Sequence, residues 1–221
     1  MTKYFIDRIN SKKGLVQGIV IIIFIYVVIS FASNEFILTE ETYYRYFEEK
    51  IEPNRIHDVT QRVLKFNVLK AIWEPVSHLL NVLGTSICLY LGCLYYNESV
   101  SFDKLVRVTL WSYLIFVIPA LVKFVYFVIA EDVAIEEFNN YSFGSLIFLL
   151  SSGDPFWLSS LLQVFTFFEI SYWVLLGFGL SKVLTWDFDD SLRLVLSSYF
   201  VGLVFWVVAR IYIKMMLFNV N

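Results

Sequence analysis

The segment LVQGIVIIIFIYVVISF, residues 15–31, decides the fold class because it carries no charged residue along its whole length. A helix of about 20 apolar residues crosses the hydrocarbon core of a bilayer. Secretory signal peptides share this order of a basic start and an apolar run, and Ser30-Phe31-Ala32 offers small residues for cleavage. The run exceeds the usual signal-peptide length of about 7–15 apolar residues. We therefore predict a retained first span at about 15–32, after a basic cytoplasmic leader at 1–14.

The composition of the whole chain agrees with a membrane protein. Of 221 residues, 58% are hydrophobic, 19% aromatic and 17% charged, with a net charge of −3 and a mean hydropathy of +0.68. Soluble domains average about 45–50% apolar and 25% charged residues. The composition excludes a soluble enzyme, a disordered tail, a secreted disulfide scaffold and a basic nucleic-acid binder. The length leaves room for about five spans and for no sizeable soluble domain.

Four further apolar runs predict the remaining spans, at about 76–96, 108–130, 166–184 and 192–213, with a tail at 214–221. Glu74-Pro75 is predicted to start the second span, since proline suits a first helical turn and an acid there suits the helix dipole. Residues 145–165 are predicted to form a broken, partly interfacial segment, because Ser151-Ser152-Gly153-Asp154-Pro155 interrupts them.

An amphipathic helical insert is predicted at 33–74. Its apolar residues recur at three- and four-residue steps, the spacing of one helix face: Ile56, Val59, Val63, Phe66, Leu69 and Trp73. Such a helix can lie on the membrane surface or cap the bundle with a solvated face, and we favour the cap. The predicted fold is an all-α polytopic membrane bundle of five transmembrane helices with this insert between spans one and two.

The distribution of basic residues predicts the orientation. With the amino end inside, the inner segments hold Lys3, Arg8, Lys12, Lys13, Lys104, Arg107, Lys182 and Arg193, and the short outer loops are acidic. We expect an integral protein of the bacterial cytoplasmic membrane with a cytoplasmic amino terminus.

The order of these parts resembles the Yip1 domain family of five-span membrane proteins, in particular its short prokaryotic branch. The matching residues are Glu74-Pro75, the third-span entry Ser101-Phe102-Asp103-Lys104-Leu105 with Pro119 further on, and the aromatic-then-glycine fourth span from Phe168 to Leu180. The likeness covers residues 15–213. The long leader and the Asp-Leu-Tyr-Gly-Pro motif of the eukaryotic members are absent from the sequence, so their Rab-linked trafficking role is not implied.

Polar residues inside the predicted spans are the candidate site residues, because a charge in a bilayer is costly and often functional. Five fall at similar depth in the outer half of the bilayer and could line a cavity: Lys123, Glu169, His78, Asn81 and Arg210. Lys123 and Glu169 could form an ion pair. Structural roles are the alternative, with lysine and arginine reaching to the head groups.

Metal binding and catalysis have little support in the sequence. Glu74 and His78 are one helical turn apart, but no third ligand accompanies them. No phosphate-binding loop, dinucleotide fingerprint or nucleophile elbow occurs. We predict no enzyme activity, no cofactor, no metal site and no nucleic-acid partner.

Small residues predict close helix packing. A stripe of small residues at four-residue spacing lies on span two, formed by Gly84, Cys88 and Gly92. Gly177 and Gly179 likewise let another helix approach span four closely. Packing within the bundle is the expected role, and homo-oligomerisation is the alternative.

The predicted function is that of a non-enzymatic, Yip1-like membrane protein that binds partners or organises a membrane complex. The expected partners are membrane lipids and other membrane proteins. The alternative is a small permease subunit, or a lipid- or solute-handling transporter, that uses the outer polar cavity. The two differ in whether a polar cavity lies among the spans.

Overall fold

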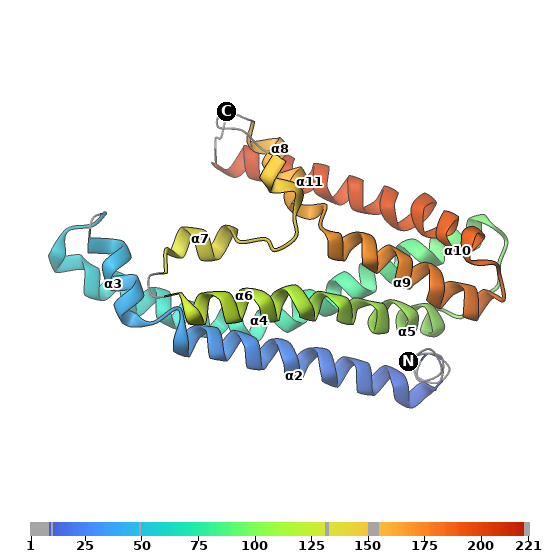
Figure 1. Ribbon diagram of the computed structural model, residues 1–221, viewed down its shortest axis with the longest axis horizontal. Coiled ribbons are helices and arrows are strands. Elements are labelled where there is room, and N and C mark those ends of the chain that lie inside the picture. Colours follow the sequence, from blue (N-terminus) through green and yellow to red (C-terminus); the bar gives the residue numbers. More distant parts are fainter. Residues whose placement is uncertain (1–8, 10, 49, 131–132, 150–154, 219–221) are drawn as a thin grey trace. The chain divides into compact units, whose positions relative to one another are not determined.

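The computed structural model describes residues 9, 11–48, 50–130, 133–149 and 155–218. Most of the predicted leader, the last three residues of the tail and residues 150–154 of the predicted broken segment lie outside this part. Within it the regular elements are all helical, with one isolated bridge between Ser145 and Thr166 (Figure 1). They are α2 (Lys12–Phe36), α3 (Glu40–Glu48), α4 (Pro53–Tyr95), α5 (Phe102–Tyr113), η1 (Leu114–Phe116), α6 (Val117–Ile129), α7 (Ile135–Asn140), η2 (Leu146–Leu149), α8 (Phe156–Val164), α9 (Phe167–Leu184), α10 (Phe188–Val195), η3 (Leu196–Phe200) and α11 (Val201–Phe218).

Five helical segments in the described part of the chain are long and apolar enough to cross a membrane. They are Lys13–Phe36, Pro53–Tyr95, Phe102–Ile129, Phe167–Leu184 and Phe188–Ile213. Each contains most or all of one predicted span. The predicted all-α membrane fold with five spans is therefore confirmed.

Helix α4 differs from the prediction, which started a helix at Glu74-Pro75. The structure has one helix of 43 residues, with Pro75 inside it. Proline suits a first turn because no N–H is needed there, whereas inside a helix it removes the hydrogen bond to the carbonyl of residue i−4 and its ring crowds that carbonyl. The Asp, Glu, Lys and Arg residues of α4 all precede Pro75. The part from 75 to 95 alone is about 31 Å long at 1.5 Å per residue, which is one bilayer crossing.

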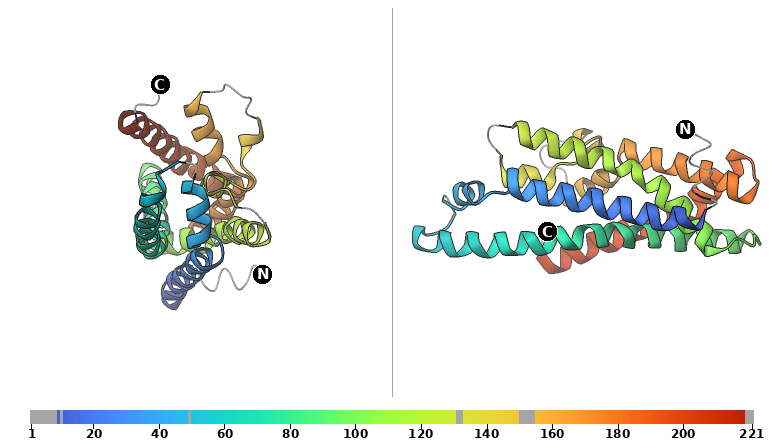
Figure 2. Two further views of the ribbon diagram at one scale, coloured as in Figure 1. Left: turned by 90° about the vertical axis from the view of Figure 1, so that its left-hand side faces the viewer. Right: turned by 90° about the horizontal axis from the view of Figure 1, so that it is seen from below.

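The described helices fall into two compact units, and each is described by itself. The second unit comprises Val20–Leu80 and Phe116–Phe143. In it α2 and the first half of α4 run antiparallel beside each other, joined through α3 (Figures 1 and 2). A small apolar core lies where α2, α3, α6 and α7 meet, formed by Ile37, Leu38, Tyr43, Phe127, Ile135 and Phe138. The predicted insert therefore contains two helices, α3 and the first part of α4, and shares its apolar core with α6 and α7.

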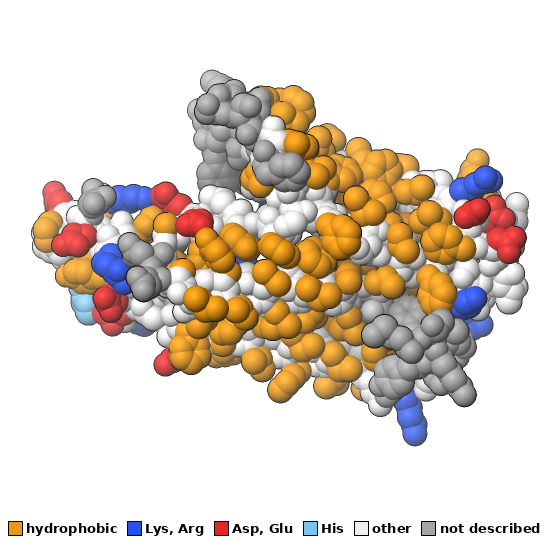
Figure 3. Space-filling view, in the orientation of Figure 1, with side chains coloured by type: hydrophobic (Ala, Val, Ile, Leu, Met, Phe, Trp, Pro, Cys, Tyr) orange, Lys and Arg blue, Asp and Glu red, His pale blue; other side chains and the backbone are white. Residues whose placement is uncertain are grey.

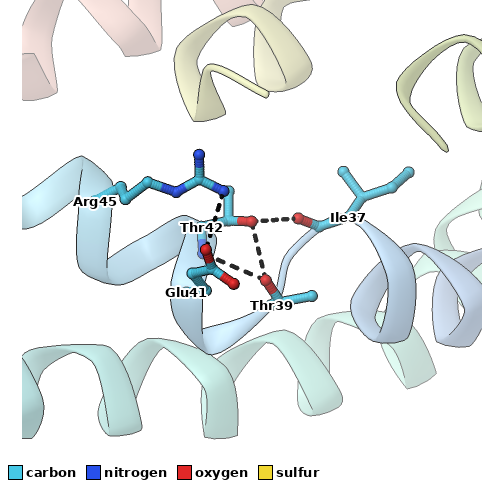
Figure 4. Close-up of polar contacts among 5 residues, drawn as sticks. All are labelled: Ile37, Thr39, Glu41, Thr42 and Arg45. Carbon is cyan, nitrogen blue, oxygen red and sulfur yellow. Dashed lines mark hydrogen bonds and ion pairs between the residues drawn. The ribbon is translucent and has the colours of Figure 1, made fainter. Parts of the chain in front are cut away.

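Threonine side chains form the turn from α2 to α3 (Figure 4). The backbone N–H of Thr42 donates to Thr39 Oγ1 over 3.3 Å, the arrangement of a helix N-cap. The Thr42 hydroxyl donates to the carbonyl of Ile37 over 3.0 Å. Glu40 and Glu41 follow in the first turn, where the helix dipole favours acids. This local chemistry ends α2 and starts α3 within four residues.

Figure 3 shows the contrast in surface chemistry within this unit. The visible surface over α2 and α6 is mainly hydrophobic, whereas acidic, basic and histidine side chains gather around α3. The apolar surface is suited to lipid and the charged surface to water.

The first unit comprises Met1–Ile19, Asn81–Ile115 and Gly144–Asn221. Helix α9 packs against both α5 and α10, and α11 packs against α8. Three tyrosine rings meet edge to face in its core: Tyr113 contacts Tyr172 at 5.9 Å between centroids, and Tyr172 contacts Tyr199 at 5.6 Å. Tyr199 lies in η3, a π-helical turn between α10 and α11. Such turns insert one extra residue into a helix and occur often at functional sites.

The segment predicted to be broken contains η2 and α8, and neither is a candidate span. Its described ends are held together by backbone hydrogen bonds. Leu146 N donates to the carbonyl of Phe165 over 3.2 Å, and Phe167 N donates to that of Gly144 over 3.0 Å. The chain therefore returns to the same place before α9 begins.

Candidate functional site

The predicted polar residues divide between the two units. Lys123 and His78 belong to the second unit, and Glu169, Asn81 and Arg210 to the first. Each group has contacts inside its own unit, and these contacts define two polar sites.

The second unit contains a cavity of about 160 Å³ between α2, α4, α6 and α7. Polar side chains supply much of its lining: Ser30, Ser33, Asn34, Asn67, Lys70, Glu74, Lys123 and Asn139. Tyr26, Phe124 and Phe138 supply part of the apolar lining. The cavity residues of α2 lie in its later half, those of α6 lie in the first eight residues of that helix, and those of α4 directly precede Pro75. The cavity is therefore lined from the later half of α2 and from the part of α4 that precedes its uncharged stretch.

Lys123 is the predicted site residue that lines this cavity. Its ammonium lies 4.2 Å from the centre of the Phe138 ring, which is within the range of a cation–π contact. Lys70 repels this ammonium, and Glu74 attracts it. Within the described residues Lys123 has no carboxylate within ion-pair distance. On insertion scales a lysine at the centre of a span costs about 2.5–3.5 kcal/mol. A polar cavity beside the ammonium lowers this cost.

Glu74 is a cavity residue that sequence reasoning did not assign. It was interpreted as a first-turn acid, but α4 begins 21 residues earlier, at Pro53, so the helix dipole no longer explains it. Its carboxylate accepts a hydrogen bond from the Ser30 hydroxyl. Ser30 itself is buried. This contact ties α2 to α4 at the cavity wall and leaves Glu74 engaged with a neutral donor.

A periodic signal in the sequence could have indicated this cavity. Tyr26, Ser30 and Ser33 share one face of α2, because they are spaced by four and three residues. Asn67, Lys70 and Glu74 share one face of α4 in the same way. Each set is a polar stripe near the end of an apolar segment. What the sequence lacks is the register that turns the two stripes toward each other.

His78 lies outside the cavity lining and contacts Tyr26 instead. The two rings stack with centroids 3.7 Å apart and planes 24° from parallel. Among the described residues no group of three or more His, Cys, Asp or Glu side chains could hold a metal ion.

Glu169 is the centre of the polar site in the first unit. Only 6% of the residue is exposed. The indole N–H of Trp173 and the hydroxyl of Tyr199 each donate to Glu169 Oε1 over 2.8 Å. Its backbone N–H donates to Thr166 Oγ1 over 3.0 Å, so Thr166 caps α9. The π-helical turn η3 carries the tyrosine that reaches this carboxylate.

Asn81 reaches the same site through aromatic contacts. Its side-chain N–H donates to the Tyr113 hydroxyl at 3.4 Å, a long hydrogen bond. Ring contacts then join Tyr113 to Tyr172 and Tyr172 to Tyr199, and the Tyr199 hydroxyl donates to Glu169. Arg210, by contrast, is exposed on α11. The predicted ion pair of Lys123 with Glu169 stays a prediction, since the two residues belong to different units with separate partners.

The glycines differ in how closely their helices are approached. A Cβ at Gly92 would lie 2.7 Å from the Ser198 Cβ, and one at Gly179 would lie 2.6 Å from a methyl carbon of Val108. A Cβ at Gly202 would lie 2.7 Å from the sulfur of Cys88. A Cβ at Gly177 would meet Phe188 and Leu192 at ordinary contact distance, 3.4 Å.

The structure corrects the prediction that Gly84 packs closely against another helix of the bundle. A Cβ there would meet no heavy atom of the described chain within 4 Å. A four-residue spacing places Gly84, Cys88 and Gly92 on one face, but the helices packed on that face reach only its later part. Packing against Gly84 within the described chain is therefore absent, and a role in homo-oligomerisation stays a prediction.

The fold and these sites define an integral, multi-pass, all-α membrane protein with a polar cavity in one unit and a buried carboxylate site in the other. Comparison with family models, curated proteins and solved structures found no match for this chain.

Proposed function

We propose that this is a non-enzymatic membrane protein that binds a small polar ligand, or the polar group of a lipid, in the cavity of the second unit. Such binding corresponds to the alternative function predicted from the sequence, that of a small permease subunit or a lipid- or solute-handling transporter. The observation that carries the proposal is the cavity of about 160 Å³ with Lys70, Glu74 and Lys123 on its wall. Lys70 is exposed, whereas Glu74 and Lys123 are half-buried. A ligand or water in the cavity can satisfy the half-buried charges, which an apolar core could not do.

The proposal is tested by asking whether the cavity holds and exchanges a molecule. Ser33 is 8% exposed and lines the cavity, so Ser33→Phe should fill much of it. Native mass spectrometry of the full chain, purified in mild detergent, should show a retained small molecule or lipid on the wild type. The same adduct should be at least tenfold depleted on Ser33→Phe.

Thiol accessibility gives a second measurement that does not depend on Ser33→Phe folding. In a background with Cys88 and Cys93 replaced by alanine, Asn34→Cys should react with a small water-soluble methanethiosulfonate. Ser86→Cys is the matched control, because Ser86 is fully buried and outside the cavity. Equal rates at the two positions, together with no adduct on the wild type, would refute the proposal.

A second candidate function is the Yip1-like one, in which the protein binds other proteins or organises a membrane complex. One observation favours it. The insert forms α3 and the first half of α4, packs Ile37, Leu38 and Tyr43 against residues of α6 and α7, and has charged side chains gathered around α3 (Figure 3). Charged, folded segments at the end of a bundle suit recognition of a protein partner by charge complementarity. On this proposal the likeness to the prokaryotic Yip1-type proteins extends to function.

Site-specific photo-crosslinking tests the second candidate in cells. A photoreactive phenylalanine analogue at Tyr44 of α3, which is 42% exposed, should give one discrete protein adduct. The same analogue at Val204 of α11, 37% exposed on an apolar helix, is the control and should give none. Absence of an adduct at Tyr44, or equal adducts at both positions, would count against a docking role.

A further inference from the structure

We infer that the cavity of the second unit selects an anion, and that the anion is a phosphate ester or free phosphate. This inference rests on the proposed function, because it names the chemistry of the ligand of that same site.

The cavity wall carries two cations and one anion. Lys70 and Lys123 both line it, and the ammonium groups repel each other. Glu74 is the carboxylate on the wall, and the Ser30 hydroxyl donates to it. Within the described residues neither lysine has a carboxylate within ion-pair distance. The wall thus has a net positive charge that a bound anion would neutralise.

Neutral donors complete an anion site around these cations. Ser33, Asn34 and Asn139 line the same cavity and offer hydroxyl or amide hydrogens. The Asn34 amide donates to the carbonyl of Asn67 over 3.4 Å, so the α2 and α4 walls are joined at this level. Lysine ammonium groups bind phosphate as point charges and need no fixed fork geometry, which suits two lysines from different helices.

The surroundings of the cavity suit a lipid source for the phosphate. Leu69 and Trp73, on the α4 turns that carry Lys70 and Glu74, are 60% and 59% exposed. Exposed tryptophan is typical of the interfacial level of a membrane. An anionic phospholipid could place its phosphate in the cavity and its acyl chains along these side chains. Free phosphate offers the same chemistry, and the experiment separates the two.

The experiment measures binding to the full chain in mild detergent by native mass spectrometry and by the shift of the thermal unfolding midpoint. The probes are phosphatidylglycerol, phosphatidylcholine and inorganic phosphate, each added separately. We expect tighter binding of phosphatidylglycerol than of phosphatidylcholine, or protection by inorganic phosphate. Either result supports the inference and identifies the source. Binding of neither anion overturns it.

Charge variants of opposite sign make the test specific. Lys123→Gln and Lys70→Gln should each weaken binding of the anion about tenfold, the loss of one charge-assisted contact. Glu74→Gln should tighten binding of the anion several-fold. The substitution removes a negative charge that repels the anion, while the glutamine side chain still offers an acceptor for the Ser30 hydroxyl. Lys65→Gln, an exposed change on the same helix outside the cavity, is the control and should have less than a twofold effect. Lys123→Arg should restore binding.

Failure of this inference can be told from failure of the proposed function. If Ser33→Phe removes a retained molecule while Lys123→Gln, Lys70→Gln and Glu74→Gln leave its binding unchanged, the cavity binds a ligand that is not an anion. In that case the inference is wrong and the proposed function stands. If the wild type retains nothing and Asn34→Cys is inaccessible, both are wrong.

Discussion

Glu74 and Glu169 are both carboxylates within candidate spans, and their neighbours satisfy them in different ways. Glu169 accepts two hydrogen bonds, from Trp173 and Tyr199, in a closed aromatic site. Glu74 accepts one from Ser30 and lines a cavity. In a low-dielectric interior the number of donors decides what a carboxylate costs. We therefore expect the stabilisation of the Glu169 carboxylate to depend on its hydrogen-bond donors. We expect that of the Glu74 carboxylate to depend on the molecule bound in the cavity.

Removing the tyrosine donor should destabilise the first unit. Tyr199→Phe leaves the Glu169 carboxylate buried with one donor, and we expect a loss of about 1–3 kcal/mol in the free energy of unfolding. Denaturant unfolding in mixed micelles measures it. In a cycle with Glu169→Gln the two changes should couple by at least 0.5 kcal/mol. Purely additive effects would mean that the hydrogen bond contributes nothing.

The same kind of cycle tests the ion pair predicted from the sequence. Lys123→Met and Glu169→Gln should couple by more than 0.5 kcal/mol if the two charges interact. Single losses without coupling would show that each residue acts only inside its own unit.

An ion pair beyond the spans gives a pH dependence. Lys50 Nζ lies 2.6 Å from Glu136 Oε1. The hydrogen bond from Lys50 lowers the pKa of Glu136 below its ordinary 4.5, with the Lys50 charge as the next cause. A lowered carboxylate pKa stabilises the fold above pH 4.5, and this is lost as the pH falls through the folded-state value. The hydrogen bond to Glu136 likewise raises the pKa of Lys50 above 10.5, so its contribution is complete below that pH and is lost above the raised value.

Glu136→Gln should therefore lower the thermal midpoint slightly at pH 7 and leave it unchanged in acid, below the folded-state pKa of Glu136. Both side chains are largely exposed, so the effect should be small and should shrink in high salt. Thermal unfolding in detergent at pH 7 and at successively lower pH measures it, with Glu48→Gln on α3 as the control for charge. A difference that persists at the lowest pH would contradict this assignment.

At the scale of the element, α4 offers two glycines that should respond in opposite directions. Gly84→Ala replaces glycine in a helix interior with no atom in the way, so it should be neutral or stabilise by up to about 1 kcal/mol. Gly92→Ala places a Cβ against Ser198 and should destabilise by about 1–3 kcal/mol. Unfolding of the two variants in the same detergent compares them. A similar loss in both would show that Gly84 is packed, as it would be at a homo-oligomer interface.

Hydropathy predicted the spans, and helix–helix register limited what else could be predicted. The runs at 15–32 and 166–184 lie within α2 and almost entirely within α9, because lipid demands about 20 apolar residues whatever the packing. The helix that contains the second span begins at Pro53 and not at Glu74-Pro75, since proline favours a first turn but does not require one. Lys123 was assigned from its charge, whereas Ser30 and Lys70 were missed. Their roles depend on which helix faces which, and a single sequence does not contain that information.

At the scale of the whole molecule, five spans predict that the two termini lie on opposite sides of the membrane. With the amino end inside, His57→Cys and Glu137→Cys should react with a membrane-impermeant maleimide in intact cells. Asp189→Cys, on the polar turn before the fifth span, should react only after the membrane is permeabilised. Each variant carries alanine at Cys88 and Cys93. Labelling of all three in intact cells would refute the five-span topology, and the reverse pattern would refute the orientation.

The π-helical turn at 196–200 has a consequence for how this chain tolerates changes in length. Its five residues hold one more than a regular α-helical path would need. Deleting one of them would restore an unbroken α-helix and leave α11 in nearly the same orientation, because the wide turn already takes up the extra residue. Gly202 would then keep its place opposite Cys88, and the loss would fall on Tyr199, which reaches Glu169 from inside the turn. Deleting one residue from the regular α-helix after Gly202 would instead rotate everything beyond it by about 100°, so a one-codon deletion should be tolerated better within 196–200 than there.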